Sequence, residues 1–383
     1  MKKYLIIHTR ELCYFSGTFF LDKLEERLEA GYDFLADIGA CEKNDSDEEI
    51  SVTRLDLLGD DADFDLLEKF VGCSFDAIID INSKLPYLIL DDGSYFLDTI
   101  DAPFYNWILD HPLYHHPGLV HKLKNYHALA IDYEHAEYMK RWYPHLKSVT
   151  YYPIPGIKAI NEIPFDERRY EILFSGTYLD KDPLEDKILA LGEKTAKLIH
   201  DVAEEWDHEN ELIDEAVMRG LNSLGIADGT DYDSIDLEKL SKMYGVLDYP
   251  ELMNHLYLAD KSARNKSRNH ILESIAEAGL PLTIMGDGWE LTDLPNYPNV
   301  EWIPAMTMSA SIEVIANTKV LLDINPLFFR GLHDRVSTGL QNGCIVATNM
   351  CEATAPEHIE DQMIFYRESN VEELIDRLRN LNK

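Results

Sequence analysis

The sequence predicts an α/β protein with two Rossmann-like domains joined by a hinge, and with a helical insert in the second domain. Short apolar runs alternate with helical patterns along most of the chain, which is typical of parallel sheets with crossover helices. The length of 383 residues favours two domains. The alternation breaks at residues 153–156 and 161–164, where prolines and a glycine predict a linker. We therefore expect two domains facing each other across a cleft, with ligands bound at the carboxyl ends of the strands.

The first domain is expected to span residues 1–155. An amphipathic helix is expected near residues 19–30, and Asp132 is placed to cap the helix that follows the last strand. Strands are expected at residues 3–7, 34–38, 76–81, 104–109 and 127–131.

The second domain is expected to span residues 165–370, followed by a C-terminal helix within residues 371–383. Residues 181–262 are acidic, mostly helical in pattern and nearly free of strand signals, so we interpret them as a helical elaboration. Strands are expected at residues 170–174, 281–285, 299–302, 320–324, 344–348 and 363–366.

The composition narrows the class of partner. Lys plus Arg is 35 and Asp plus Glu is 70, so the formal net charge is −35. Such a surface repels nucleic-acid backbones and anionic lipid, and a basic group that binds an anion must sit in a local pocket. The five cysteines are scattered and form no C-x-x-C pair, which argues against a disulfide framework or a structural zinc site. Apolar runs are too short for a signal peptide or a membrane span, so we expect a cytoplasmic protein.

The most informative basic segment follows the buried strand at residues 320–324. Gly331 allows a tight turn, and His333 or Asp334 can cap the helix that begins there. A helix N-terminus at the end of a strand is a natural anion site, and Arg335 in its first turn can grip a phosphate with two N–H groups. The alternative is an ion pair between Arg335 and Asp334 or another carboxylate. Because a cation in the first turn opposes the helix dipole, the anion ligand gains weight.

Two more segments of the second domain suit an anion. Residues 175–177, Ser-Gly-Thr, follow a strand, and small residues there let backbone N–H groups approach a diphosphate. The alternative is a simple tight turn. Arg264, Lys266 and Arg268 form a basic cluster entering the helix at residues 271–278. A salt-bridged helix end is the alternative for that cluster.

A partial glycine fingerprint, Met-Gly-Asp-Gly-Trp, occupies residues 285–289. It lacks a third glycine, and Pro295 and Pro298 follow where a helix should begin, which disfavours a nicotinamide-binding loop. We interpret the segment as a strand-end loop that lines the cleft.

In the first domain, Asp110 and His111 end a strand, and Pro112 stiffens the turn after them. An Asp–His pair on such a loop can serve as a general base. Half of the fourteen histidines lie between residues 111 and 145. Prolines at positions 112 and 117 break the helical spacing that a zinc site would use, so we expect structural histidines and no metal.

Several of these segments together resemble a known family. In the second half they are Leu173-Phe174-Ser175-Gly176-Thr177, the helix with Arg268, residues 284–289, residues 321–326, and Gly331-Leu332-His333-Asp334-Arg335-Val336. In the first half the resemblance rests on Leu109-Asp110-His111-Pro112, with a weaker likeness at Asp132 and Tyr143-Pro144. The chain from about residue 76 onward resembles the group-1 glycosyltransferases of the spore-maturation-protein-like branch, which have the GT-B fold. The resemblance is poor in the insert. This sequence departs from two features that relatives often carry. One is a pair of glutamates about seven residues apart, and the other is a His-Gly-Gly after the hinge proline.

The resemblance implies a glycosyltransferase whose second domain holds a nucleotide-sugar and whose first domain presents an acceptor. It implies no metal and no cofactor, with a UDP-sugar as the favoured donor and a surface glycan, glycoprotein or small molecule as acceptor. The residues implied for the donor site are Ser175, Gly176, Thr177, Arg268, Gly286, Trp302, Asn325, Gly331, His333 and Asp334, and those implied for catalysis are Asp110, His111 and Arg335. Trp302 would lie near the nucleobase, or alternatively in the core.

Other functions stay open at this point. In an inverting reaction Asp110 or His111 would act as base, whereas in a retaining reaction the leaving phosphate would take the proton. A nucleotide-sugar-binding scaffold without activity and a GT-B-fold epimerase are the alternative classes. The acidic insert at residues 181–262 is a candidate surface for a protein partner.

Overall fold

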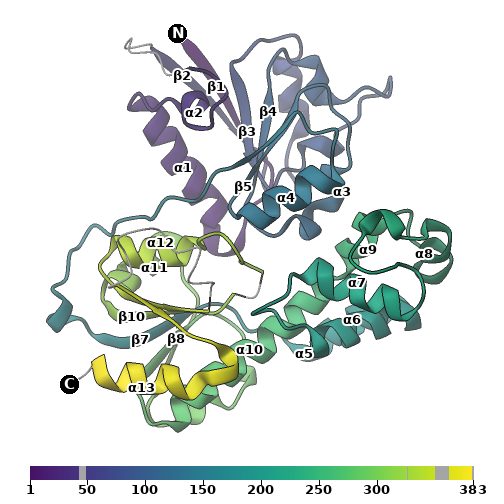
Figure 1. The fold of residues 1–383 in the computed structure, drawn as a ribbon. Coiled ribbons are helices and arrows are strands. Elements are labelled where there is room, and N and C mark those ends of the chain that lie inside the picture. Colours follow the sequence, from purple (N-terminus) through teal and green to yellow (C-terminus); the bar gives the residue numbers. More distant parts are fainter. Residues whose placement is uncertain (43–48, 326, 350–361, 382–383) are drawn as a thin grey trace. The chain divides into compact units, whose positions relative to one another are not determined.

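The computed structural model describes residues 1–42, 49–325, 327–349 and 362–381, which form two compact α/β units (Figure 1). Unit 1 comprises Met1–Pro153 with Thr307–Ser309, and unit 2 comprises Ile154–Met306 with Ala310–Lys383. Each unit has a six-stranded parallel sheet flanked by helices. The predicted α/β fold with two parallel sheets is therefore confirmed.

The sheet of unit 1 has the order β2-β1-β3-β4-β5-β6. The sheet grows from β1 in both directions, so its switch point lies between β1 and β3. The strands are β1 (Lys2–His8), β2 (Ile50–Asp56), β3 (Ala77–Ile81), β4 (Phe104–Ile108), β5 (Tyr126–Ala130) and β6 (Ser148–Tyr151). The helices are α1 (Ser16–Glu29), α2 (Phe34–Asp37), α3 (His116–Leu119) and α4 (Tyr133–Trp142), with short 3-10 turns that include η3 (Leu85–Tyr87) and η5 (Pro112–His115).

The sheet of unit 2 has the order β12-β11-β10-β7-β8-β9, and its switch point lies between β7 and β10. The strands are β7 (Tyr170–Ser175), β8 (Leu282–Met285), β9 (Val300–Ile303), β10 (Thr318–Asp323), β11 (Ile345–Thr348) and β12 (Met363–Phe365). The helices beside this sheet are α10 (Tyr257–Glu277), α11 (Met308–Ala316), α12 (Asp334–Gln341) and α13 (Val371–Leu381).

Alternate residues of the unit 2 strands build two separate cores, as the strand period of two requires. Phe174 and Leu322 point to the face covered by α10 and α13. Leu173 and Leu321 point to the opposite face, where α11 and α12 contribute Ile315 and Val336. The C-terminal helix α13 is thus part of the unit 2 core.

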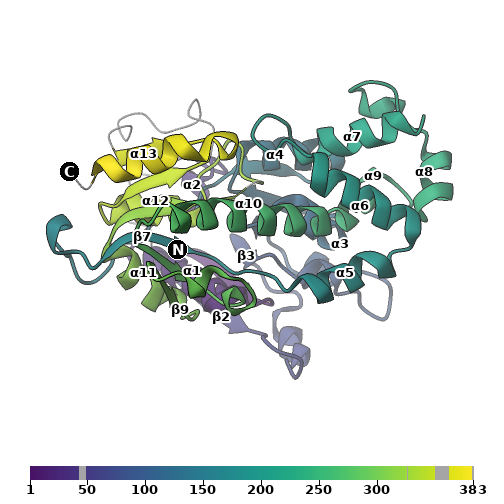
Figure 2. The same ribbon diagram turned by 90° about the horizontal axis from the view of Figure 1, so that it is seen from below.

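The residues predicted as a helical insert form helices between β7 and α10. They are α5 (Lys181–Ala190), α6 (Glu193–Glu205), α7 (Ile213–Ser223), α8 (Leu237–Tyr244) and α9 (Tyr249–His255). Figure 2 shows them gathered at one end of α10, which is the long helix that links them to the sheet. Leu198, Val217, Leu221 and Leu252 are fully or almost fully buried, so the insert has an apolar core of its own.

One predicted element is wrong, and two strands were not anticipated. Residues 34–38 were expected as a strand, but they form helix α2, because the Asp33 carboxylate caps it by accepting from the Ala36 N–H at 3.2 Å. Phe34 is buried edge-on against Tyr4 and Tyr105, so this short helix packs like a core strand would. The strands β2 and β6 form the two edges of the unit 1 sheet.

The described cysteines are Cys13, Cys41, Cys73 and Cys344, and all four are free thiols. Cys351 lies outside the described residues. Within the described part of the chain, every helix is too short or too polar to cross a lipid bilayer.

Candidate functional site

Two predicted arginines meet at the switch point of unit 2. The ring of Phe174, near the end of β7, has the Arg268 guanidinium carbon 5.4 Å and the Arg335 guanidinium carbon 5.7 Å from its centroid. Arg268 comes from α10 and Arg335 from α12. Ligands of open α/β sheets bind where the strand order reverses, so the two cations lie where the fold places a ligand.

Arg268 is a buried cation with unsatisfied hydrogen-bonding capacity. Its residue is 6% exposed, and one terminal N–H donates to the Thr177 carbonyl at 2.7 Å. Its buried Nε has no hydrogen-bond partner among the described residues. Burial, then the nearby charges of Arg264 and Arg335, hold the pKa of Arg268 well below its usual range. An unpaired buried donor beside a second cation is costly, and a bound anion would relieve that cost.

Arg335 makes the ion pair that was the alternative reading, but with Asp323 and not with Asp334. The distance from its Nη1 to Asp323 Oδ1 is 2.9 Å. The other oxygen of Asp323 accepts from the Thr348 hydroxyl at 3.1 Å. Because this bond takes one of the five N–H groups of a guanidinium, Asp323 orients Arg335 and leaves donors for a ligand.

His333 caps α12 and also contacts the side chain of Asp334. Its Nδ1 lies 2.5 Å from Asp334 Oδ1 and 3.3 Å from the backbone nitrogen of Arg335. An unprotonated Nδ1 accepts from the Arg335 N–H and caps the helix, whereas a protonated Nδ1 donates to Asp334 instead. Burial acts to raise the pKa of the Asp334 carboxyl, but His333 and Arg335 outweigh it and hold that pKa at about 2. Asp334 is therefore ionised at neutral pH, and its charge is balanced locally.

The loops after β7 and β8 pack backbone against backbone. The Gly176 N–H donates to the Met285 carbonyl at 2.9 Å, and the Tyr178 N–H donates to the Asp287 carbonyl at 3.0 Å. Trp289 Nε1 donates to the Gly176 carbonyl at 2.7 Å. The Gly176 N–H, which was predicted to face a diphosphate, is thus used to join the two loops. Gly176 contributes to this packing by its small size.

Gly288 makes this packing possible, and its replacement tests it. Its φ is +84°, and a Cβ there would lie 2.0 Å from the Tyr178 carbonyl oxygen. We expect Gly288→Ala to lower the free energy of unfolding by at least about 3 kcal/mol, because it combines backbone strain with a clash. Gly279→Ala is the matched control, since φ is +74° there and a Cβ meets no described atom within 4 Å. Equal losses in urea unfolding would contradict the packing argument.

The remaining predicted donor residues lie on the same sheet or its loops. Trp302 is half-buried against the core, and its Nε1 donates to the Gly286 carbonyl at 2.8 Å. Asn325 is buried just after β10, and its Oδ1 has no hydrogen-bond partner in the described part of the chain. Ser175 ends β7, and Gly331 is buried just before α12. The structure therefore brings Arg268 and Arg335 to the Phe174 ring, and the other residues lie on strands or loops of the same unit.

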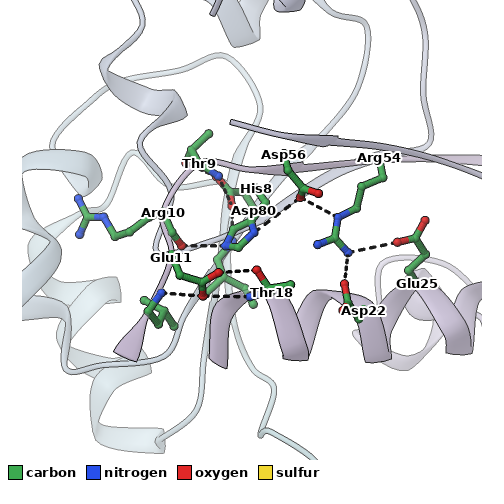
Figure 3. Close-up of polar contacts among 12 residues, drawn as sticks. His8, Thr9, Arg10, Glu11, Thr18, Asp22, Glu25, Arg54, Asp56 and Asp80 are labelled. Atoms are coloured by element: carbon green, nitrogen blue, oxygen red, sulfur yellow. Dashed lines mark hydrogen bonds and ion pairs between the residues drawn. The ribbon is translucent and has the colours of Figure 1, made fainter. Parts of the chain in front are cut away.

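Unit 1 has a polar cluster at its own switch point that the sequence reading missed. Asp80, in β3, is fully buried and accepts from the Thr9 hydroxyl at 2.5 Å and from the Ile81 N–H at 2.7 Å. Figure 3 shows this pair beside His8, with Arg54 of β2 bound to Asp56 at 2.9 Å on the far side. Burial raises the pKa of Asp80 to about 7, although hydrogen bonds from Ser83 and Thr9 oppose it. The signal in the sequence that could have indicated this cluster is an aspartate inside an apolar strand.

The raised pKa of Asp80 predicts a pH dependence of stability. Between about pH 4, where the unfolded carboxyl titrates, and about pH 7, the folded state binds the extra proton. The contribution of Asp80 is therefore full below pH 4, falls as the pH rises to 7, and is lost above it. We expect the unfolding free energy of the wild type to fall, relative to that of Asp80→Asn, by a few kcal/mol as the pH rises over this range. Urea titrations measure both values. A difference that does not change with pH would contradict the assignment.

Asp110 and His111, predicted as a pair, differ in exposure and in their hydrogen-bond partners. Asp110 follows β4 with its side chain 53% exposed, and its Oδ2 accepts from Asn82 Nδ2 at 3.0 Å and lies 3.6 Å from His115 Nε2. His111 is buried, and its Nδ1 accepts from the Leu113 N–H at 3.1 Å to cap η5. Burial, then the neighbouring His135 and His115, hold the pKa of His111 well below its usual range. His111 is thus a neutral capping group, and Asp110 is the accessible member of the pair.

Comparisons with known proteins give structural likeness at low scores. No family model and no curated protein sequence matches the chain. The fold is similar to an alpha-glucosyltransferase in complex with UDP-glucose and DNA containing an abasic site, at 13% identity and a TM-score of 0.46, over 99% of this chain and 90% of that one. It is also similar to E. coli heptosyltransferase WaaC with ADP, at 12% identity and a TM-score of 0.33, over 99% and 98%.

Proposed function

We propose that the protein is a glycosyltransferase that moves a sugar from a nucleotide-sugar to an acceptor hydroxyl, with the donor held by unit 2. The observation that supports it best is Arg268, which is buried with an unpartnered Nε beside Arg335 at the switch point of the sheet. In a chain with a net charge of −35, a buried arginine with an unpartnered donor, set beside a second arginine, is costly unless an anion binds there. A diphosphate suits two guanidinium groups, because each can donate two parallel hydrogen bonds.

The proposed reaction exchanges one bond for another at the anomeric carbon of the sugar. The bond from that carbon to the diphosphate oxygen breaks, and a bond to the acceptor oxygen forms. Arg268 and Arg335 stabilise the charge that develops on the departing nucleoside diphosphate. Asp110 of unit 1 contacts the acceptor hydroxyl and, in an inverting reaction, takes its proton.

The remaining assignments complete this proposal. Trp302 is assigned to the nucleobase side, and Thr177, Asn325, Gly331, His333 and Asp334 to the diphosphate and sugar. The two guanidinium groups supply the positive charge that a divalent cation supplies elsewhere, so we propose a reaction without a metal or other cofactor. A UDP-sugar is the favoured donor.

The experiment begins with thermal shift of the whole protein against UDP-, GDP-, dTDP- and CMP-sugars. A ligand that binds the folded state raises the melting temperature by mass action. Arg268→Gln should abolish the shift, whereas Arg379→Gln, a surface control, should keep it. No shift with any donor would contradict the proposal.

Product analysis then separates transfer from the other classes. Mass spectrometry with an acceptor panel should show the acceptor gaining one sugar, at a rate that EDTA leaves unchanged. A donor altered without any acceptor would indicate an epimerase, and binding without turnover would indicate a scaffold protein.

A further inference from the structure

The end of β3 holds a buried asparagine in an unusual backbone conformation. Asn82 has a φ of +44° and is 1% exposed. Only glycine enters this left-handed region freely, although asparagine tolerates it better than most residues. The conformation costs free energy that the surrounding contacts must offset.

Three hydrogen bonds join Asn82 to one segment, at the end of β4. Its backbone N–H donates to the Trp107 carbonyl at 3.0 Å. Its side-chain Oδ1 accepts from the Leu109 N–H at 3.0 Å, and its Nδ2 donates to Asp110 Oδ2 at 3.0 Å. The residue directly after β3 thus holds the end of β4 and the carboxylate that follows it.

We propose that Asn82 is a positioning residue that holds the Asp110 carboxylate in its ionised, acceptor-facing state. This inference rests on the proposed function, because it gives Asp110 its role at the acceptor. An amide N–H donates to a carboxylate without bringing a charge, so it favours the ionised form and fixes its direction.

Histidines also lie near Asp110. His115 Nε2 lies 3.6 Å from the same oxygen, and its residue is buried. The rings of His111 and His135 pack against each other, with centroids 4.7 Å apart. Protonation of His115 would also favour ionised Asp110, so a test must change Asn82 while leaving the histidines intact.

Two substitutions separate positioning from folding. Asn82→Gly keeps the backbone conformation at lower cost but removes both side-chain hydrogen bonds. Asn82→Asp keeps the shape and the oxygen that accepts from Leu109, but it sets a second carboxylate against Asp110. Two carboxylates that share a site raise the apparent pKa of the pair.

The matched control is another buried amide of the same sheet, within β4. Asn106 donates to the Tyr126 hydroxyl at 3.0 Å and accepts from the Ser83 N–H at 3.0 Å. Asn106→Asp therefore buries an extra carboxylate nearby without replacing the donor to Asp110.

The experiment measures kcat, the KM for the donor and the pH profile of transfer, together with the melting temperature of each variant. We expect Asn82→Asp to lower kcat at least tenfold near pH 7, to move the acid limb of the profile upward by about one pH unit or more, and to leave the donor KM unchanged. Asn82→Gly should lower kcat at least tenfold without lowering the melting temperature by more than a few degrees. Asn106→Asp should leave the acid limb in place. Wild-type kcat in Asn82→Gly, or an unmoved acid limb in Asn82→Asp, would overturn the proposal.

A second readout separates failure of this inference from failure of the proposed function. Carboxyl ¹³C NMR, with the Asp110 signal assigned by its loss in Asp110→Asn, reports the titration of Asp110 without any substrate. An upward shift of that titration in Asn82→Asp supports the positioning contact even if the wild type transfers no sugar. An unchanged titration overturns it, whatever the activity.

Discussion

Arg335→Ala is expected to lower the rate of sugar transfer by at least tenfold, and on the order of 10²-fold if its guanidinium contacts the leaving diphosphate directly. The physical reason is that the charge on the departing phosphate loses one of its two guanidinium partners. Steady-state kinetics with a saturating acceptor measures the effect. A rate equal to wild type in the folded variant would remove Arg335 from the mechanism.

The ion pair with Asp323 makes a control necessary. Removing Arg335 leaves the buried Asp323 carboxylate without its cation, which lowers stability independently of catalysis. Adding Asp323→Asn to Arg335→Ala should restore the melting temperature but not the rate. Arg335→Lys keeps the charge but not the paired N–H groups, so it should fall between wild type and Arg335→Ala.

Asp110→Asn is expected to lower kcat by roughly 10²-fold or more, within the range of general-base contributions, while donor affinity stays unchanged. The carboxylate is replaced by an amide of the same shape, so proton transfer is lost while the fold of the loop is kept. Donor affinity is measured by calorimetry and kcat by product formation.

Asp91→Asn is the matched control for this substitution, because Asp91 is an exposed carboxylate in the same unit. It should leave both quantities unchanged. If Asp110→Asn weakened donor binding and spared kcat, Asp110 would belong to the donor site instead.

The fold followed from the sequence where the apolar runs were long and buried. All six strands of unit 2 lie within about two residues of their predicted limits, and the central ones are continuous apolar runs, as buried parallel strands require. The strand predicted at residues 34–38 was wrong, because a short apolar run fits a buried helix turn as well as a strand. The edge strand β2 alternates polar and apolar residues, and its half-buried pattern gave a weaker signal.

Residues of the candidate site could be predicted where the signal lies in the neighbouring sequence. Arg335 follows a strand and opens a helix, and Arg268 stands out in an acidic chain. Asn82 and Asp80 could not be assigned in this way. Their roles depend on partners just after β1 and β4 that are distant in sequence, and on a left-handed backbone at Asn82.

The order of the strands in unit 2 also has a consequence for synthesis of the chain. Phe174 of β7 lies opposite Ile284 of β8 and Leu322 of β10, and the whole insert and α10 separate it from both. On the ribosome, β7 therefore emerges with neither neighbour, and at about 10 residues per second it waits on the order of ten seconds for the first of them. During that interval the insert can gather its own apolar core, whereas Ile172 and Phe174 stay exposed to chaperones or to other nascent chains.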